Sequence, residues 1–259
     1  MEYDYIKCGD CVELMSYLTD SCIDLTITSP PYDNLRNYNG FNWDFEKTAK
    51  ELYRITKQGG VVVWVISDAT VKGSETGTSF KQALYFKEIG FNLHDTMIYK
   101  KKNPTPQRSN RYQSCFEYMF VFSKGKPKTF NPLMVEKKYI ENRKNKQYNK
   151  TADGAQIVRA YASTSNLKPI DNIWEYSVGL HHTTSDKIAF EDPAIFPEQL
   201  VSDHILTWSN EGDIILDPFV GSGTTAKMAK LNNRHYIGFD ISEEYCALAE
   251  KRISLTVQN

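Results

Sequence analysis

Apolar and polar positions along the 259-residue chain follow two periods that predict two kinds of element. Short runs rich in β-forming residues are typical of strands, whereas apolar positions three and four apart are typical of amphipathic helices. The run 61–66 is apolar throughout, as in strands buried on both faces of a parallel sheet. The other predicted strands are 5–8, 23–28, 92–99, 116–122, 213–217 and 235–240. The predicted helices are 11–18, 45–56, 80–89, 197–209, 225–231 and 243–253.

This alternation of strands and helices predicts a doubly wound α/β sheet. Gly59 and Gly60 predict a turn before the apolar strand, and the stretch 33–43, rich in Gly and Asn, predicts a loop. Between Gly125 and Thr184 the chain is rich in Lys, Asn and Tyr and has no clear period. The predicted organisation is therefore a core formed by 1–124 and 185–259, with 125–184 as an inserted module.

The composition argues against a membrane-spanning or secreted protein. No apolar run approaches the roughly 18 residues that span a bilayer, and the N-terminus lacks the basic-then-apolar pattern of a secretory signal. The five cysteines are scattered, which favours a reducing compartment, so we expect a cytoplasmic protein. Cys8 and Cys11 have CxxC spacing, but no second pair or histidine in register accompanies them. No metal site is predicted.

A glycine turn stands where a predicted strand passes into a helix, in the segment 217–225. Glycines let a ligand approach the backbone, and a helix N-terminus offers free N–H donors. Asp240 ends the next strand, where an acidic residue can accept hydrogen bonds from ribose hydroxyls. The turn therefore indicates an adenosine-containing cofactor, although glycines also permit close helix packing. A P-loop is excluded because Thr224 follows Gly223, and a nicotinamide dinucleotide fold would need more chain after Asp240.

A second turn, Ser29-Pro30-Pro31-Tyr32, follows the predicted strand 23–28. Prolines remove N–H donors and leave carbonyl oxygens available, Ser29 adds a hydroxyl acceptor, and Tyr32 adds an aromatic face. Such a set complements a nucleobase amino group, which presents N–H donors beside a flat ring. Ligands of open α/β sheets bind beyond the carboxyl ends of the strands, where both turns lie.

These residues resemble the amino-directed DNA methyltransferases, which transfer a methyl group from S-adenosylmethionine to N4 of cytosine or N6 of adenine. The segment 28–32 resembles the catalytic motif of that family, and 217–225 resembles its cofactor motif. Their order along the chain is similar to the circularly permuted beta class. The resemblance implies a Rossmann-like sheet in which strand 5–8 lies beside the strand that ends at Asp240, with 125–184 as the target-recognition region.

The resemblance also assigns residues to roles. The implied catalytic residues are Ser29, Pro30, Pro31 and Tyr32. Asp10 resembles the acidic residue that contacts the adenine of the cofactor, and Asp240 the one that binds its ribose. Phe196 lies in a segment similar to one that packs on the methionine end, although Asp192 stands where the family pattern predicts histidine. The remaining implied cofactor residues are Asp217, Phe219, Gly221, Ser222, Gly223, Thr224 and Thr225.

The implied reaction is direct methyl transfer to a base that is flipped out of the duplex and stacks on Tyr32. Its amino group would bond to Ser29 and to the carbonyl of Pro30. In the family, Ser before Pro-Pro goes with N4-cytosine and Asp or Asn with N6-adenine, so cytosine is the preferred prediction and adenine the alternative. C5-cytosine methylation is disfavoured because no cysteine follows a proline. RNA or protein methyltransferases and a non-catalytic nucleic-acid-binding module remain as further alternatives.

The formal net charge of −1 conceals a strong asymmetry along the chain. Residues 100–159 hold 15 basic and four acidic side chains, or +11, whereas the remainder holds 16 basic and 28 acidic, or −12. Such polarity is typical of a surface for a phosphate backbone, so double-stranded DNA is the predicted partner. A nucleoid-associated location, a cognate restriction endonuclease, and a monomer or homodimer are compatible with this class. The candidate DNA-binding residues are Lys101, Arg108, Arg111, Lys138, Arg143, Lys144 and Lys146.

Overall fold

A computed structural model describes most of the chain, in two compact units. The described residues are 2–31, 43–106, 110–137, 145–151, 153–161, 165–179, 182–192, 195 and 197–256; for 145–148 and 158–161 the backbone alone is described. Unit 1 comprises Met1–Asn131 and Asn172–Asn259, and unit 2 comprises Pro132–Asp171. None of the described helices is long and apolar enough to cross a bilayer.

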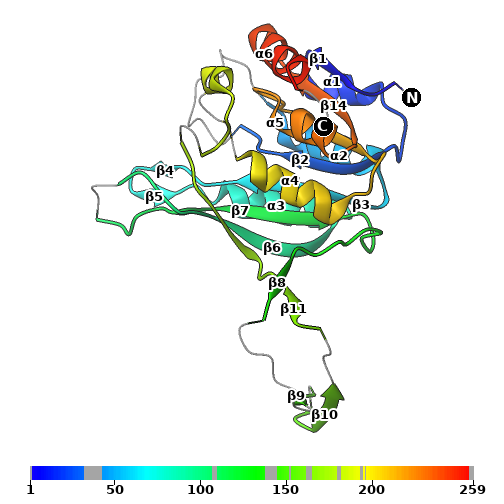
Figure 1. The fold of residues 1–259 in the computed structure, drawn as a ribbon, viewed down its shortest axis with the longest axis vertical. Coiled ribbons are helices and arrows are strands. Elements are labelled where there is room, and N and C mark those ends of the chain that lie inside the picture. Colours follow the sequence, from blue (N-terminus) through cyan, green and yellow to red (C-terminus); the bar gives the residue numbers. More distant parts are fainter. Residues whose placement is uncertain are drawn as a thin grey trace. The chain divides into compact units, whose positions relative to one another are not determined.

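The centre of unit 1 is an eight-stranded mixed sheet (Figure 1). In spatial order its strands are β1 (Tyr5–Cys8), β14 (His235–Asp240), β13 (Ile214–Asp217), β2 (Ile23–Thr28), β3 (Thr56–Ile66), β7 (Phe116–Ser123), β6 (Asn92–Lys101) and β12 (Ile173–Tyr176). The first five pair in parallel, and β7 runs antiparallel to both β3 and β6. A short hairpin, β4 (Thr70–Val71) with β5 (Ser74–Glu75), follows β3.

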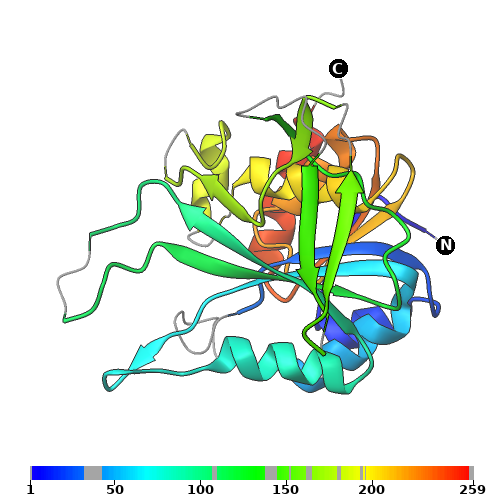
Figure 2. The same cartoon turned by 90° about the horizontal axis from the view of Figure 1, so that it is seen from below.

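Helices cover both faces of this sheet, as the doubly wound prediction requires (Figure 2). One face carries α1 (Cys11–Ser16), α2 (Phe45–Ile55) and α3 (Thr78–Glu88). The other carries α4 (Glu198–Trp208), α5 (Thr224–Leu231) and α6 (Glu243–Ser254), and a 3₁₀ helix, η1 (Lys187–Glu191), precedes α4. The first strand and the last helix lie together, because β1 pairs with β14 and contacts α6. This arrangement agrees with the permuted order predicted from the sequence.

The main core lies between the sheet and the helices α1, α2 and α3. Its aromatic centre is formed by Trp64, Phe86 and Phe122, with ring centroids 5.1 Å apart for the first two and 4.5 Å for the last two. Burying each such side chain stabilises the fold by about 1.5–3 kcal/mol. A smaller apolar cluster of Val220, Ala226, Ala249 and Ile253 supports the glycine turn on the other face.

Two local predictions need correction. Gly59 and Gly60 do not end a helix-to-strand turn but lie inside β3, where the pairing with β2 jumps from Ile23↔Thr56 to Leu25↔Val61. The glycines allow this bulge, because a Cβ on Gly60 would lie 2.8 Å from the Thr56 methyl group. No strand was predicted in the stretch 125–184, which has no clear period, but it contains several, and one of them, β12, belongs to the main sheet through parallel pairing with β6.

Unit 2 consists of two antiparallel strand pairs. The strands β8 (Met134–Glu136) and β11 (Leu167–Pro169) pair with each other, and β9 (Asn145–Lys150) pairs with β10 (Gln156–Tyr161). This unit lies within the predicted insertion 125–184 and is shorter at both ends. Its assignment to target recognition stays a prediction.

Candidate functional site

The two sequence motifs meet where the neighbouring strands β13 and β2 end. The chain passes from β13 into α5 on one face, and the next helix after β2 is α2 on the other, so this edge is a topological switch point. The Thr28 hydroxyl donates a hydrogen bond of 2.6 Å to Oδ1 of Asp217, and both side chains are buried. Ser29 and Pro30 continue directly from this contact. The structure therefore brings together the two turns that the sequence predicted as partners.

Asp217 carries a carboxylate deep inside the protein. Burial raises its pKa to about 6, although hydrogen bonds from Thr28, Thr225 and the Phe219 N–H lower it and nearby Asp240 raises it further. The Phe219 N–H lies 3.1 Å from the same Oδ1 atom that Thr28 contacts. One carboxylate oxygen therefore holds both the end of β2 and the start of the glycine turn.

The glycine turn has backbone angles that favour glycine. Gly221 and Gly223 have φ values of +49° and +82°, in the left-handed region. A Cβ on Gly223 would lie 2.8 Å from the Cβ of Ala249, so this glycine also lets α5 approach α6 closely. The N–H groups of the turn bind carboxylates: Gly221 donates to Asp240 over 2.9 Å, and Ser222 donates to Asp192 over 3.1 Å.

The side chains around this turn face protein partners. Ser222, Thr224 and Thr225 are all buried. The Thr225 hydroxyl donates to the carbonyl of Ile27 over 3.3 Å, while Phe219 packs edge-on against Trp43 at 5.2 Å between ring centroids. The structure therefore gives these residues supporting contacts within the fold, and a direct role in cofactor binding stays a prediction for each of them.

Asp240 and Asp10 stand at the ends of neighbouring strands. The register pairs Cys8 with Asp240, which places the following Asp10 at the same edge. Asp240 accepts hydrogen bonds from the backbone N–H groups of Gly221 and Ser242, and burial raises its pKa above the ordinary value in spite of them. Asp10 caps α1 by accepting from Val12 and Glu13 over 2.9 and 3.0 Å.

A network of ion pairs around a buried arginine lies behind the turn and was not found from the sequence. Arg252, which is 1% exposed, donates to the Ser222 carbonyl over 3.1 Å, to the Thr224 hydroxyl over 2.9 Å and to Asp186 over 2.9 Å. It also donates to Glu198. An arginine within the apolar positions of the last predicted helix is the one signal that could have revealed it.

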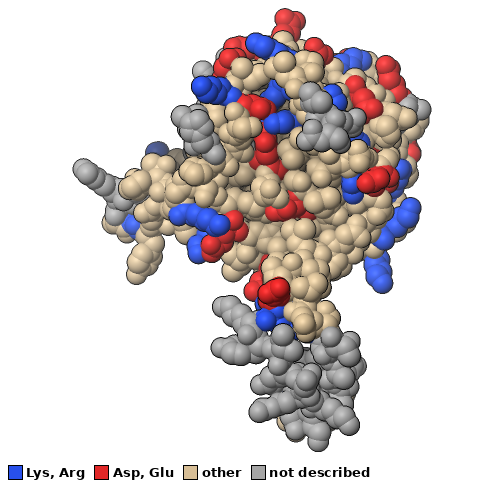
Figure 3. Space-filling view, in the orientation of Figure 1, with Lys and Arg blue, Asp and Glu red and all other residues tan. Residues whose placement is uncertain are grey.

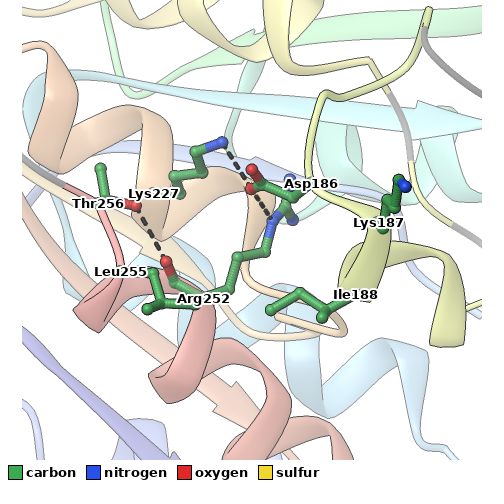
Figure 4. A pocket seen from close by; sticks show the side chains of 7 residues that line it. All are labelled: Asp186, Lys187, Ile188, Lys227, Arg252, Leu255 and Thr256. Carbon is green, nitrogen blue, oxygen red and sulfur yellow. Dashed lines mark hydrogen bonds and ion pairs between the residues drawn. The ribbon is translucent and has the colours of Figure 1, made fainter.

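Lys227 of α5 completes this network by pairing with Asp186 and Glu198, each over 2.7 Å. Figure 4 shows the Lys227 and Arg252 side chains both directed at Asp186. All three residues line a cavity of about 310 Å³. Burial acts against ionisation of Asp186, but hydrogen bonds from Lys227 and Arg252 and their charges lower its pKa below the ordinary value. The lining residues are Asp186, Lys187, Ile188, Lys227, Arg252, Leu255 and Thr256.

Several predicted site residues lie outside the described part of the chain, namely Tyr32, Arg108, Lys138, Arg143, Lys144 and Phe196; for Lys146 only the backbone in β9 is described. Of the candidate DNA contacts, Lys101 pairs with Glu117 over 2.6 Å, and Arg111 pairs with Glu75 over 3.5 Å and donates to the Gly73 carbonyl. On the face that Figure 3 draws, basic and acidic side chains of unit 1 are interspersed.

Comparisons with known proteins agree with this geometry. The model of the DNA methylase family N6_N4_Mtase matches residues 23–251. The orphan methyltransferase M.BamHII of Bacillus amyloliquefaciens is 58% identical over 246 residues, which are 90% of this chain and 89% of the relative. The chain belongs to the N6/N4 amino-DNA methyltransferase family. The resemblance stated from the two motifs is thereby confirmed.

Solved structures of such enzymes share the fold. The PvuII DNA methyltransferase, described as cytosine-N4-specific, matches with a TM-score of 0.69 at 20% identity over 97% of this chain and 90% of its own. M1.HpyAVI in its complex with S-adenosylmethionine matches with a TM-score of 0.62 at 22% identity over 96% and 98%. The predicted Rossmann-like methyltransferase fold and the cofactor of the family are confirmed.

Proposed function

We propose that this amino-DNA methyltransferase transfers a methyl group from S-adenosylmethionine to N4 of cytosine in double-stranded DNA. The observation that carries the proposal is the bond between Thr28 and Asp217, because it joins the acceptor-rich turn to the glycine turn at one edge of the sheet. Ser29 supports cytosine as the target, as does the cytosine-N4 specificity in the name of the PvuII neighbour.

The carboxylates at this edge fit the cofactor. A carboxylate has about four acceptor positions, and the N–H groups bonded to Asp240 leave capacity for a ribose hydroxyl. Asp10 presents a second carboxylate one strand away. We assign Asp240 to the ribose, Asp10 to the adenine, and the backbone of 221–223 to the rest of the cofactor, with Phe219 and Phe196 beside it. Asp217, Thr224 and Thr225 shape the turn from within.

The catalytic turn presents acceptors rather than an acid or a nucleophile. Ser29 and Pro31 are half-buried at the sheet edge, and Pro30 is buried. The Ser29 hydroxyl and the Pro30 carbonyl accept from the target amino group and orient its nitrogen, while Tyr32 stacks on the base. S-adenosylmethionine supplies a methyl group activated by a sulfonium, so the residues of this chain contribute binding and orientation.

Recognition of DNA is assigned to the basic region. The candidates are Lys101, Arg108 and Arg111 in unit 1 and Lys138, Arg143, Lys144 and Lys146 in unit 2. Lys101 and Arg111 already have carboxylate partners, so they would exchange an ion pair for a phosphate contact.

The decisive experiment identifies the methylated nucleoside. We expect N4-methylcytosine in DNA from a host without its own DNA methylation that expresses the protein, measured by mass spectrometry after digestion. Ser29→Ala should abolish the signal while binding of S-adenosylmethionine persists, and Ser254→Ala, on the exposed side of α6, should retain both. N6-methyladenine would transfer the assignment to adenine. Absence of any methylated base, with no cofactor binding by the folded protein, would refute the proposal.

A further inference from the structure

A buried hydroxyl joins the catalytic turn to the cofactor turn. We infer that Thr28 is a positioning residue for methyl transfer: through its bond to Asp217 it fixes the turn 29–31 relative to the glycine turn. The inference rests on the function proposed above. It adds to the site a side chain that precedes the Ser-Pro-Pro-Tyr turn and itself contacts neither base nor cofactor.

The geometry of the bond supports this role. Thr28 is fully buried and Asp217 is 2% exposed, so water does not compete for the 2.6 Å contact between them. The Oδ1 atom that accepts from Thr28 also accepts from the Phe219 N–H over 3.1 Å. A single oxygen therefore sets the separation between the residue before Ser29 and a residue inside the glycine turn.

The backbone pairing of β2 explains why a side-chain contact is needed to connect Thr28 to β13. Pairing between β2 and β13 covers Leu25↔Ile215 and Thr26↔Leu216 and ends there. Beyond it, Thr28 remains paired with Trp64 of β3 on its other side. On the cofactor side two hydroxyl contacts continue the connection, from Thr28 to Asp217 and from Thr225 to the Ile27 carbonyl.

Methyl transfer is sensitive to the separation between the turn 29–31 and the glycine turn. Reaction requires the attacking atom to lie about 3–3.5 Å from its target in line with the breaking bond, so a small displacement of one turn reduces the rate strongly. Without the hydroxyl, the buried Asp217 carboxylate would lose a donor, and the end of β2 would be free to shift. Cofactor binding depends on Asp240 and the backbone of 221–223, which this loss leaves in place.

The test compares three substitutions in one strand. Thr28→Val removes the bonded hydroxyl, Thr28→Ser retains a hydroxyl, and Thr26→Val removes a buried hydroxyl that has no hydrogen-bond partner among the described residues. Incorporation of tritiated methyl groups into unmethylated genomic DNA gives the turnover rate, and titration calorimetry gives the affinity for S-adenosylmethionine. Thermal melting reports the folded fraction of each variant.

We expect Thr28→Val to lower turnover about 10- to 100-fold, the range that corresponds to loss of a hydrogen bond to a charged group. Cofactor affinity should change less than about threefold, and Thr28→Ser and Thr26→Val should stay within about threefold of the natural protein. Thr28→Ala removes the same hydroxyl; it should reproduce the loss and decides the question if Thr28→Val does not fold.

Equal turnover of Thr28→Val and Thr26→Val would overturn the positioning role while leaving the proposed function intact. A loss of cofactor affinity as large as the loss of turnover would also overturn it, because the contact would then serve binding. If the natural protein neither binds S-adenosylmethionine nor methylates DNA, the proposed function fails and the inference fails with it.

Discussion

Two sets of carboxylates support the glycine turn, and they differ both in burial and in what surrounds the charge. Asp217 is 2% exposed, whereas the side chains of Asp186 and Glu198 are 29% and 19% exposed. Asp217 accepts from the Thr28 hydroxyl and from the Phe219 N–H, and burial raises its pKa to about 6. Asp186 bonds to Lys227 and Arg252, and these cations lower its pKa in spite of burial. Hydroxyl and N–H donors therefore offset part of the cost of full burial at Asp217, whereas two cations more than offset the smaller cost of partial burial at Asp186.

This difference indicates that the two sets of carboxylates have different roles. The network around Arg252 joins α6, η1, α4 and α5 to the turn, and its charges are balanced, so it is suited to stability. The Asp217 carboxylate has no cation among its described partners and remains at the junction of the two motifs at a cost in stability. Strongly perturbed carboxylates of this kind are concentrated at functional sites.

The largest expected effect is that of Arg252→Met. Among the described residues it would leave Lys227 as the one cation paired with Asp186 and Glu198, and it would remove the donors to Ser222 and Thr224. Breaking a buried ion pair from one side costs about 3–5 kcal/mol, so we expect a loss of that size in the free energy of unfolding, measured with urea.

Lys47→Met is the matched control for that substitution. Lys47 also pairs with a carboxylate, Asp44, over 3.0 Å, but the two side chains are 70% and 46% exposed. An exposed pair contributes at most about 1 kcal/mol. If both variants lost equally little stability, the buried network would not hold the turn, and the contrast with Asp217 would disappear.

The second prediction concerns pH. Between its ordinary pKa of 3.8 and its folded pKa of about 6, Asp217 binds a proton in the folded protein but not in the unfolded chain. Its stabilising contribution is therefore complete below 3.8 and is lost as the pH rises through about 6. Asp186 behaves oppositely: its contribution is present above 3.8 and is lost as the pH falls through its lowered folded pKa.

Paired asparagine variants separate these contributions. The difference in unfolding free energy between the natural protein and Asp217→Asn should shift by about 2 kcal/mol in favour of the variant between pH 4 and pH 7.5. The corresponding difference for Asp186→Asn should stay nearly constant over this range, because its titration lies below it. A flat profile for Asp217→Asn would show that the carboxylate is ionised across the whole range.

The secondary structure was predicted well where local patterns are strong and poorly where they are not. Strong local patterns located β1, β2 and β14 within the correct bounds, and the ends of the predicted helices differed by one or two residues. The strand β12 was missed because it lies in a region without a period and pairs with β6, which is about 75 residues away in the chain. Such pairing depends on tertiary packing and not on local preference.

The functional site likewise contains residues that the sequence predicted and residues that it did not. The sequence predicted that Ser29, Asp217 and Asp240 lie at one edge of the sheet, because each follows or ends a strand of a doubly wound fold. It did not predict the roles of Thr28 and Arg252. The first depends on which strands are neighbours in the sheet. The second requires Asp186, which precedes η1, Glu198 of α4 and Thr224 of α5 to converge on one guanidinium.

The smallest expected effect is that of Thr26→Val, which compares a buried hydroxyl without a described partner with the bonded hydroxyl of Thr28. Thr26 and Thr28 are both fully buried in β2, but among the described residues no hydrogen-bond partner faces the Thr26 hydroxyl. Valine keeps the branched shape and removes the desolvation cost of an unbonded hydroxyl, so the free energy of unfolding should rise by about 1 kcal/mol. Thr28→Val should lower the free energy of unfolding, because the Thr28 hydroxyl donates a hydrogen bond that offsets part of the cost of burying the Asp217 carboxylate. Urea unfolding of the two variants measures both signs, and a loss of stability in Thr26→Val would mean that its hydroxyl has a partner and that the two positions differ less than the structure indicates.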